Sequence, residues 1–103
     1  MVNKIKSISN EQALLKKARL FAIVGDDTRI KILCFLFESK EPCVSEISSK
    51  IDATIANTSH HLQLMHREGL LATERKGNNI CYKLVKNEFT KELKKIICDV
   101  EFK

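Results

Sequence analysis

The 103-residue sequence has little of what interrupts a helix: it contains one proline and three glycines. We therefore expect long helices and few loops. The sequence also lacks an apolar run of 18 residues, which excludes a membrane-spanning helix and leaves no membrane partner to expect. Its N-terminus has no apolar core of the kind that a signal peptide carries. These absences predict a cytoplasmic protein.

Catalytic and metal-binding patterns are also missing. We find no phosphate-binding loop, no arguable Ser-His-Asp or Cys-His-Asn set and no paired carboxylates in a plausible cleft, so an enzyme or a bound cofactor is not expected. No CxxC pair or zinc-finger spacing occurs among the four cysteines, and no metal site is expected. In a cytoplasmic protein the cysteines should be thiols rather than a disulfide framework. They are Cys34, Cys43, Cys81 and Cys98.

The composition that is present is that of one globular domain. Hydrophobic residues make up 44% of the chain and charged residues 30%, as in ordinary soluble domains. We assign residues 1–103 to a single domain, with a mobile polar tail over 1–9. The formal net charge of +5 suits a polyanionic partner, although a mildly basic chain is weak evidence alone.

Apolar spacing and capping residues predict a mainly α fold (class α+β) with five helices and one β-hairpin between the fourth and the fifth. Cys43 takes the cap position of the third helix, with Glu46 three residues later to return a hydrogen bond. The expected helices cover 10–24, 28–38, 44–50, 55–68 and 88–100, and the expected strands are 71–76 and 79–84.

The stretch Thr54–Leu71 organises the chain. Its first half carries short polar side chains, its second half keeps an apolar spacing, and Gly69 can end the helix in the left-handed conformation. A short helix, a tight turn and this longer helix form a helix-turn-helix, and the hairpin that follows forms a wing. Such a helix is suited to docking in the major groove of DNA.

The last predicted helix carries an apolar stripe, formed by Phe89, Leu93, Ile96, Ile97 and Val100. Two interpretations remain open from the pattern alone. The stripe packs on the domain's own core, or it forms a homodimer interface together with the first helix.

Four segments together resemble the ArsR/SmtB family of winged-helix repressors over about residues 10–100. They are GDDTRIKILCFL, PCVSEISSKI, ANTSHHLQLMHREGLL and ERKGNNICYKL. The resemblance implies a dimeric repressor that binds an inverted-repeat operator in double-stranded DNA and releases it when an effector binds. It also implies DNA-contacting roles for the recognition helix and the basic wing, at Thr54, Asn57, Thr58, Ser59, His60, Gln63, Arg75 and Lys76.

The same resemblance lets effector sites be tested in turn. The family's zinc site needs histidine on the last helix, and residues 87–103 contain none. Its arsenic or cadmium site needs two close thiols where this chain has Cys43-Val44-Ser45, and soft ions prefer two or three thiolates. A site that combines Cys43 with a thiol from elsewhere remains open.

The positions of Cys34 and Cys98 resemble the sulfide- and redox-responsive branch of the family. That likeness implies that persulfide, polysulfide or an oxidant links the two thiols and releases DNA. Cys43 is a second candidate for the sensing thiol, because a helix N-terminus favours the thiolate. Cys81, on the polar face of its strand, is expected to be incidental. The alternatives are a soft-metal sensor that uses these thiolates, and a constitutive repressor whose cysteines only pack.

Overall fold

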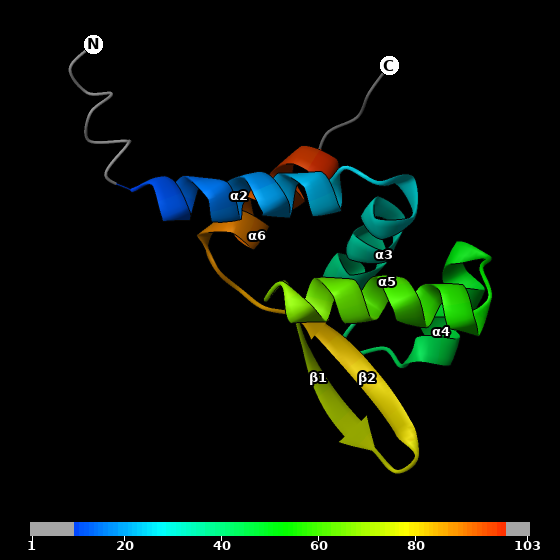
Figure 1. The fold of residues 1–103 in the computed structure, drawn as a ribbon. Helices are drawn as coiled ribbons and strands as arrows, with labels where there is room; N and C mark the ends of the chain where they lie inside the picture. Colours follow the sequence, from blue (N-terminus) through cyan, green and yellow to red (C-terminus); the bar gives the residue numbers. More distant parts are fainter. Residues whose placement is uncertain (1–9, 99–103) are drawn as a thin grey trace, which may run out of the picture.

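The structure, a computed structural model, describes residues 10–98, and along them five helices flank one antiparallel hairpin (Figure 1). The predicted fold class is confirmed. The expected tail over 1–9 and Val100 lie outside the described residues. No helix within 10–98 is long and apolar enough to cross a membrane. The elements are α2 (Glu11–Val24), α3 (Asp27–Glu38), α4 (Val44–Ile51), α5 (Ile55–Arg67), β1 (Leu71–Lys76), β2 (Asn79–Leu84) and α6 (Glu88–Ile97).

Helix starts lie where short polar side chains can cap them. The Asp26 carboxylate accepts a hydrogen bond from the Arg29 backbone N–H at 3.1 Å and begins α3. The Thr54 hydroxyl accepts one from the Asn57 backbone N–H at 3.0 Å and begins α5. Caps of this kind each stabilise a helix by about 1 kcal/mol. They explain why the sequence predicts these boundaries well.

The hairpin closes through a two-residue loop. Lys76 pairs with Asn79 at the tip, and Leu71 pairs with Leu84 at the base. Gly77 occupies the first loop position with φ of 65°, which side chains rarely adopt and which a type II′ hairpin turn requires. The hairpin therefore projects as a narrow wing beyond α5, away from α2 and α6 (Figure 1).

One core joins the helix-turn-helix to the rest of the domain. Side chains from α3, α4 and α5 meet there with 0% exposure: Ile32, Leu33, Ile47, Leu62 and Met65. The base of the hairpin adds Leu70, Leu71 and Tyr82, and the outer helices add Leu20, Ile23, Val24 and Leu93. Because α5 is anchored by its second half, its polar first half has a fixed position on the surface.

Helices α2 and α6 lie at the end of the molecule opposite the wing (Figure 1). The Phe21 and Phe89 rings pack edge to face, with centroids 5.3 Å apart. The stripe of the last helix divides: Leu93 is buried in the domain's own core, whereas Ile96 is 56% exposed. On α2, large apolar side chains are also exposed, namely Leu14, Leu15 and Phe21. This end of the molecule thus presents an uncovered apolar face.

Candidate nucleic-acid interface and thiol pairs

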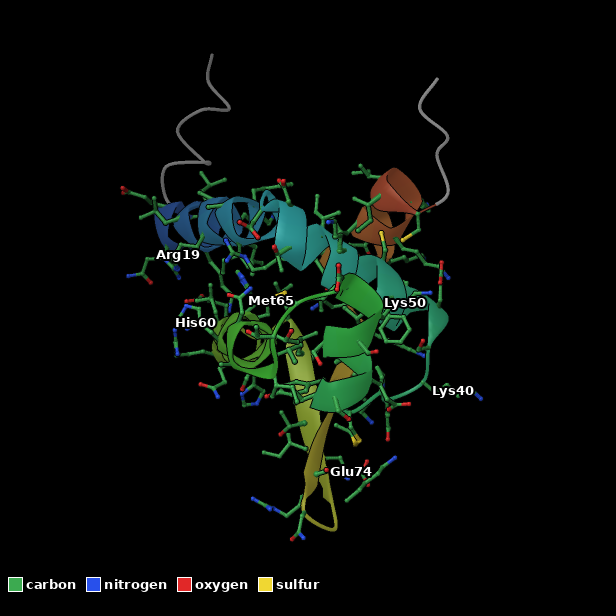
Figure 2. All side chains as sticks on the ribbon, turned by 90° about the vertical axis from the view of Figure 1, so that its right-hand side faces the viewer. Arg19, Lys40, Lys50, His60, Met65 and Glu74 are labelled. Atoms are coloured by element: carbon green, nitrogen blue, oxygen red, sulfur yellow. A yellow bond between two sulfur atoms is a disulfide. The ribbon has the colours of Figure 1, made fainter. Side chains whose placement is uncertain are left out.

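The first half of α5 presents its polar side chains to solvent. Asn57, His60 and Gln63 are exposed, and Ser59 is half-buried. The Gln63 amide donates a hydrogen bond to the Ser59 hydroxyl at 3.2 Å. Figure 2 looks along α5, with His60 on its outer side and Met65 on the side that faces the core. This surface has the donors and acceptors that reading base edges requires.

Thr54 and Thr58 differ in position, although both were predicted to flank the contacts. Thr54 is exposed at the cap. Thr58 is fully buried, and within the described residues its hydroxyl oxygen has no hydrogen-bond partner. The prediction of a DNA contact at Thr58 is therefore wrong, because position 58 falls on the face of α5 that packs on the core.

An arginine of α3 holds α5 by a side-chain hydrogen bond. The Arg29 guanidinium donates to the Ile23 carbonyl oxygen at 2.6 Å and lies 3.1 Å from Nδ1 of His61. Because arginine can only donate, Nδ1 of His61 accepts and carries no proton. Partial burial, then the nearby Arg29 charge, lowers the pKa of His61, and the Asp26 carboxylate opposes this. A neutral His61 therefore fixes the recognition helix to α3.

The wing carries the two predicted basic contacts in different settings. Arg75 and Lys76 are both exposed near the tip. Lys76 forms an ion pair with Glu41 at 3.1 Å, and Lys83 forms one with the other oxygen of Glu41 at 3.5 Å. The hydrogen bond from Lys76 lowers the pKa of Glu41. Lys76 thus has an acidic competitor for a DNA phosphate, which makes the exposed Arg75 the simpler candidate.

Cys34 and Cys98 meet between α3 and the C-terminal end of α6. Their Sγ atoms are 3.5 Å apart, both residues are half-buried, and neither is joined in a disulfide. The Cys34 thiol also lies 3.7 Å from the Ile97 carbonyl oxygen. The periodicity of the last helix allows Cys98 to face either its own domain or water, and the structure turns it toward its own domain. Two thiols at this separation can be joined by a small movement of either helix.

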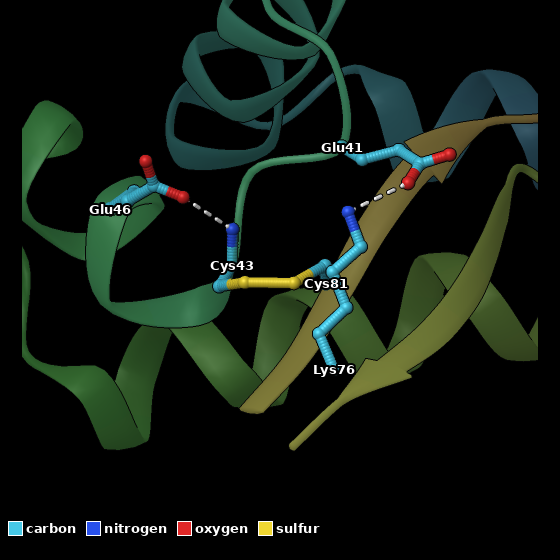
Figure 3. The surroundings of a disulfide bond; sticks show 5 residues. All are labelled: Glu41, Cys43, Glu46, Lys76 and Cys81. Carbon is cyan, nitrogen blue, oxygen red and sulfur yellow. Dashed lines mark hydrogen bonds and ion pairs between the residues drawn. A yellow bond between two sulfur atoms is a disulfide. The ribbon is translucent and has the colours of Figure 1, made fainter. Parts of the chain in front are cut away.

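Cys43 and Cys81 form a disulfide between the start of α4 and strand β2 (Figure 3). The expectation that all four cysteines are thiols is therefore wrong, and Cys43 is no free sensing thiol in this state. Cys81 is only 1% exposed, so its assignment to a polar strand face is also wrong. The physical reason is long-range: the loop before α4 packs on β2 and covers that face. The predicted cap geometry at Cys43 holds, since its N–H donates to Glu46 at 2.8 Å.

No group of three or more His, Cys, Asp and Glu side chains that could hold a metal ion occurs in residues 10–98. Two residues that contact the candidate interface were not predicted, namely Arg29, which meets His61 of α5, and Glu41, which meets the wing. Arg29 follows the Asp26 cap by three positions. An arginine in the first turn of a largely apolar helix was the sequence feature that could have indicated its role. Nothing in the sequence around Glu41 indicates that it meets the wing.

Comparisons with a family model, with individual proteins and with solved structures agree on one family. Residues 26–73 match the family described as bacterial regulatory protein, arsR family. The chain is 33% identical over 92 residues to a cadmium resistance transcriptional regulatory protein CadC homolog from Staphylococcus aureus, covering 89% of this chain and 75% of that protein. It is 33% identical over 72 residues to the arsenical resistance operon repressor of Escherichia coli, covering 70% of this chain and 62% of that protein.

Among solved structures, HlyU from Vibrio cholerae superimposes with a TM-score of 0.75 at 27% identity, covering 85% of this chain and 98% of that chain. A structure of the same protein described as reduced gives the same TM-score, covering 87% and 97%.

Proposed function

Because the chain belongs to the arsR family of DNA-binding bacterial regulatory proteins, and not to a family of enzymes, we propose that it is a cytoplasmic repressor that releases its operator when Cys34 and Cys98 become linked. The observation that carries this proposal is the 3.5 Å separation of the two Sγ atoms. In this proposal Asn57, Ser59, His60 and Gln63 read base edges, while Thr54, Arg75 and Lys76 contact the backbone. Base contacts select the sequence, and backbone contacts supply affinity and salt dependence.

The repressor acts as a homodimer in this account. The exposed apolar face on α2 and α6 includes Leu14, Phe21 and Ile96, at 48%, 59% and 56% exposure. Large apolar side chains exposed together at one end of a domain are typical of an interaction site. A two-fold dimer would set two recognition helices at a fixed spacing that matches the two halves of an inverted repeat.

Linking the Cys34 and Cys98 thiols requires a polysulfide as the oxidant and neither a metal nor a cofactor. A polysulfide supplies HS–SH, which transfers sulfur to one thiol and gives Cys–S–SH and H₂S. The second thiol then attacks the inner sulfur, a disulfide forms, and a second H₂S leaves. Two cysteine thiols are oxidised by two electrons, and the polysulfide is reduced to two H₂S.

Closing the bond would draw the Sγ atoms from 3.5 Å to about 2 Å. The end of α6 must then approach α3, or α3 must shift. Helix α6 contributes to the proposed dimer face, and α3 holds α5 through the bond between Arg29 and His61. Either movement changes the spacing or tilt of the recognition helices, which lowers the fit to a fixed operator.

The test uses a fluorescent duplex that the reduced protein has selected from a random-sequence library. Affinity is measured by anisotropy before and after sodium tetrasulfide, in a Cys43→Ala/Cys81→Ala background so that only one thiol pair remains. We expect at least a tenfold loss of affinity on treatment, and no loss when Cys98→Ser is added. Unchanged affinity in a treated sample whose Cys34–Cys98 link is confirmed by mass would end this proposal.

A soft-metal sensor is the second candidate, favoured by the cadmium and arsenical resistance relatives. Cys34 and Cys98 supply two thiolates, where soft ions take two or three. Titration with cadmium or arsenite, followed by thiolate-to-metal absorption and by operator affinity, separates the two effectors. Affinity that responds to neither metal nor polysulfide identifies the third alternative, a constitutive repressor with structural cysteines.

A further inference from the structure

The loop between α3 and α4 is fastened to the wing by polar contacts. The Pro42 carbonyl oxygen accepts a hydrogen bond from the Tyr82 N–H at 3.0 Å. Glu41 reaches two lysines of the hairpin, with Lys76 Nζ at 3.1 Å and Lys83 Nζ at 3.5 Å. Both ion pairs are partly exposed, and such pairs contribute at most about 1 kcal/mol each. These contacts alone hold the wing weakly.

The covalent link between Cys43 and Cys81 lies at the same contact (Figure 3). The two Cα atoms are 3.8 Å apart and form an isolated antiparallel bridge. The two sulfurs differ in accessibility, since Cys43 is half-buried and Cys81 is 1% exposed. A small thiol or disulfide in solution therefore reaches the pair through Cys43.

The described part of the chain holds two cysteine pairs in opposite states. Cys43 and Cys81 are joined, whereas Cys34 and Cys98 are thiols with their sulfurs 3.5 Å apart. The first pair links α4 to the wing, and the second lies between α3 and α6. Each pair therefore lies at a different part of the proposed DNA-binding apparatus: one at the wing, the other at the helices of the proposed dimer face.

We infer that Cys43 and Cys81 are a second, reversible thiol–disulfide couple, which raises affinity for duplex DNA when it is closed by fastening the wing to the helix-turn-helix. This inference rests on the proposed function, because a DNA-binding regulator works in a reducing compartment. Disulfides in that setting are usually transient and regulatory rather than structural.

The chemistry of closing uses a low-molecular-weight disulfide as the oxidant. The Cys43 thiolate attacks one sulfur of RSSR, forms the mixed disulfide Cys43–S–SR and releases RS⁻. Cys81 loses its proton and attacks the Cys43 sulfur, which closes the bond and expels the second RS⁻. Two protein thiols lose two electrons, and RSSR becomes two RSH after protonation. An excess of RSH reverses both steps at the accessible Cys43.

Closing the Cys43–Cys81 disulfide strengthens DNA binding by ordering the wing before the duplex binds. Recognition helix α5 and the tip residues Arg75 and Lys76 must engage one duplex together. A fastened wing has its position fixed before binding, so less conformational entropy is lost when the complex forms. We expect a gain of about 3- to 10-fold in affinity on closing, of the size that ordering one contact side chain before binding gives.

The experiment uses a Cys34→Ser/Cys98→Ser variant, which lacks the other thiol pair. Its affinity for the selected duplex is measured after equilibration with reduced glutathione and, separately, with oxidised glutathione. Trypsin places each cysteine on its own peptide, cutting after Lys40, Lys50, Lys76 and Lys83 around this pair. Peptide masses therefore report whether Cys43 and Cys81 are joined in each sample.

We expect tighter binding in the oxidised sample with an unchanged salt dependence, because a fastened wing presents the same cationic side chains and neutralises no further DNA phosphate. A matched variant with Cys43→Ala and Cys81→Ala added should show one affinity under both conditions. Equal affinity for the closed and open forms would overturn the inference, as would a pair that never opens under reduced glutathione. A protein that binds no duplex in either state refutes the proposed function instead.

Discussion

Removing the cap of the recognition helix is a quantitative test of how the interface is built. The Thr54 hydroxyl accepts the Asn57 backbone N–H at 3.0 Å. The Thr54 side chain is otherwise exposed, so Thr54→Ala deletes one cap and creates no cavity. A lost cap of this type costs about 1 kcal/mol of unfolding free energy.

That free energy converts to a measurable shift. With a urea m-value of about 1–3 kcal/mol/M for a domain of this size, the unfolding midpoint should fall by about 0.3–1 M. The melting temperature should fall by about 4–8 °C. Circular dichroism follows both transitions without DNA, because Thr54 is also a proposed backbone contact. Protomer concentration is kept constant, since dimer formation makes stability depend on it.

Thr54→Ser is the matched control, because it keeps the capping oxygen. It should lose less than half of what Thr54→Ala loses. If the alanine variant unfolds at the wild-type midpoint, the cap does not hold α5. If the serine variant loses as much as the alanine variant, the methyl group and not the hydrogen bond is responsible.

Two further predictions concern the attachment of α5 to the body of the domain. The lowered pKa of His61 means that the folded state prefers the neutral imidazole. The stability that this preference contributes is fully present above the unfolded pKa of about 6.5 and is lost as the pH falls from there through the lower folded pKa. Urea unfolding midpoints should show this loss in the wild type and less of it in His61→Gln, and equal pH profiles for the two proteins would contradict the prediction. Leu62 is 0% exposed, so Leu62→Ala should cost about 2–5 kcal/mol in urea unfolding, and a cost below about 1 kcal/mol would show that the second half of α5 is not its anchor.

The sequence predicts helix boundaries well because the capping chemistry is local. Asp26, Thr54 and Asn87 each cap from within three residues of the N–H they bind. The hairpin was predicted with the same ends, since Gly77 and the alternating strands carry that information locally. Neither required knowledge of which elements pack together.

The misassignment of the cysteines depends on a distant contact. Cys81 is buried because the loop before α4, 38 residues earlier at Cys43, covers its strand. Thr58 is a different case, because it precedes Leu62 by four residues and Met65 by seven and so shares their buried helix face, which helical periodicity alone indicates. The expectation that Cys34 and Cys98 form a pair came from a family resemblance. Helical periodicity alone left two orientations open for the Cys98 side chain. Local patterns fix elements, whereas thiol pairs depend on how elements pack.

The most direct test of the account is a parallel titration of bond formation and operator binding. In the Cys43→Ala/Cys81→Ala variant, Cys34 and Cys98 lie on separate tryptic peptides, 32–40 and 96–103, so the linked fraction can be measured by mass at each polysulfide concentration. We expect the fraction of protein able to bind the selected duplex to fall in proportion as the linked fraction rises, and to recover when a reductant opens the link. Binding that persists at full linkage, or that is lost before the link forms, would contradict it.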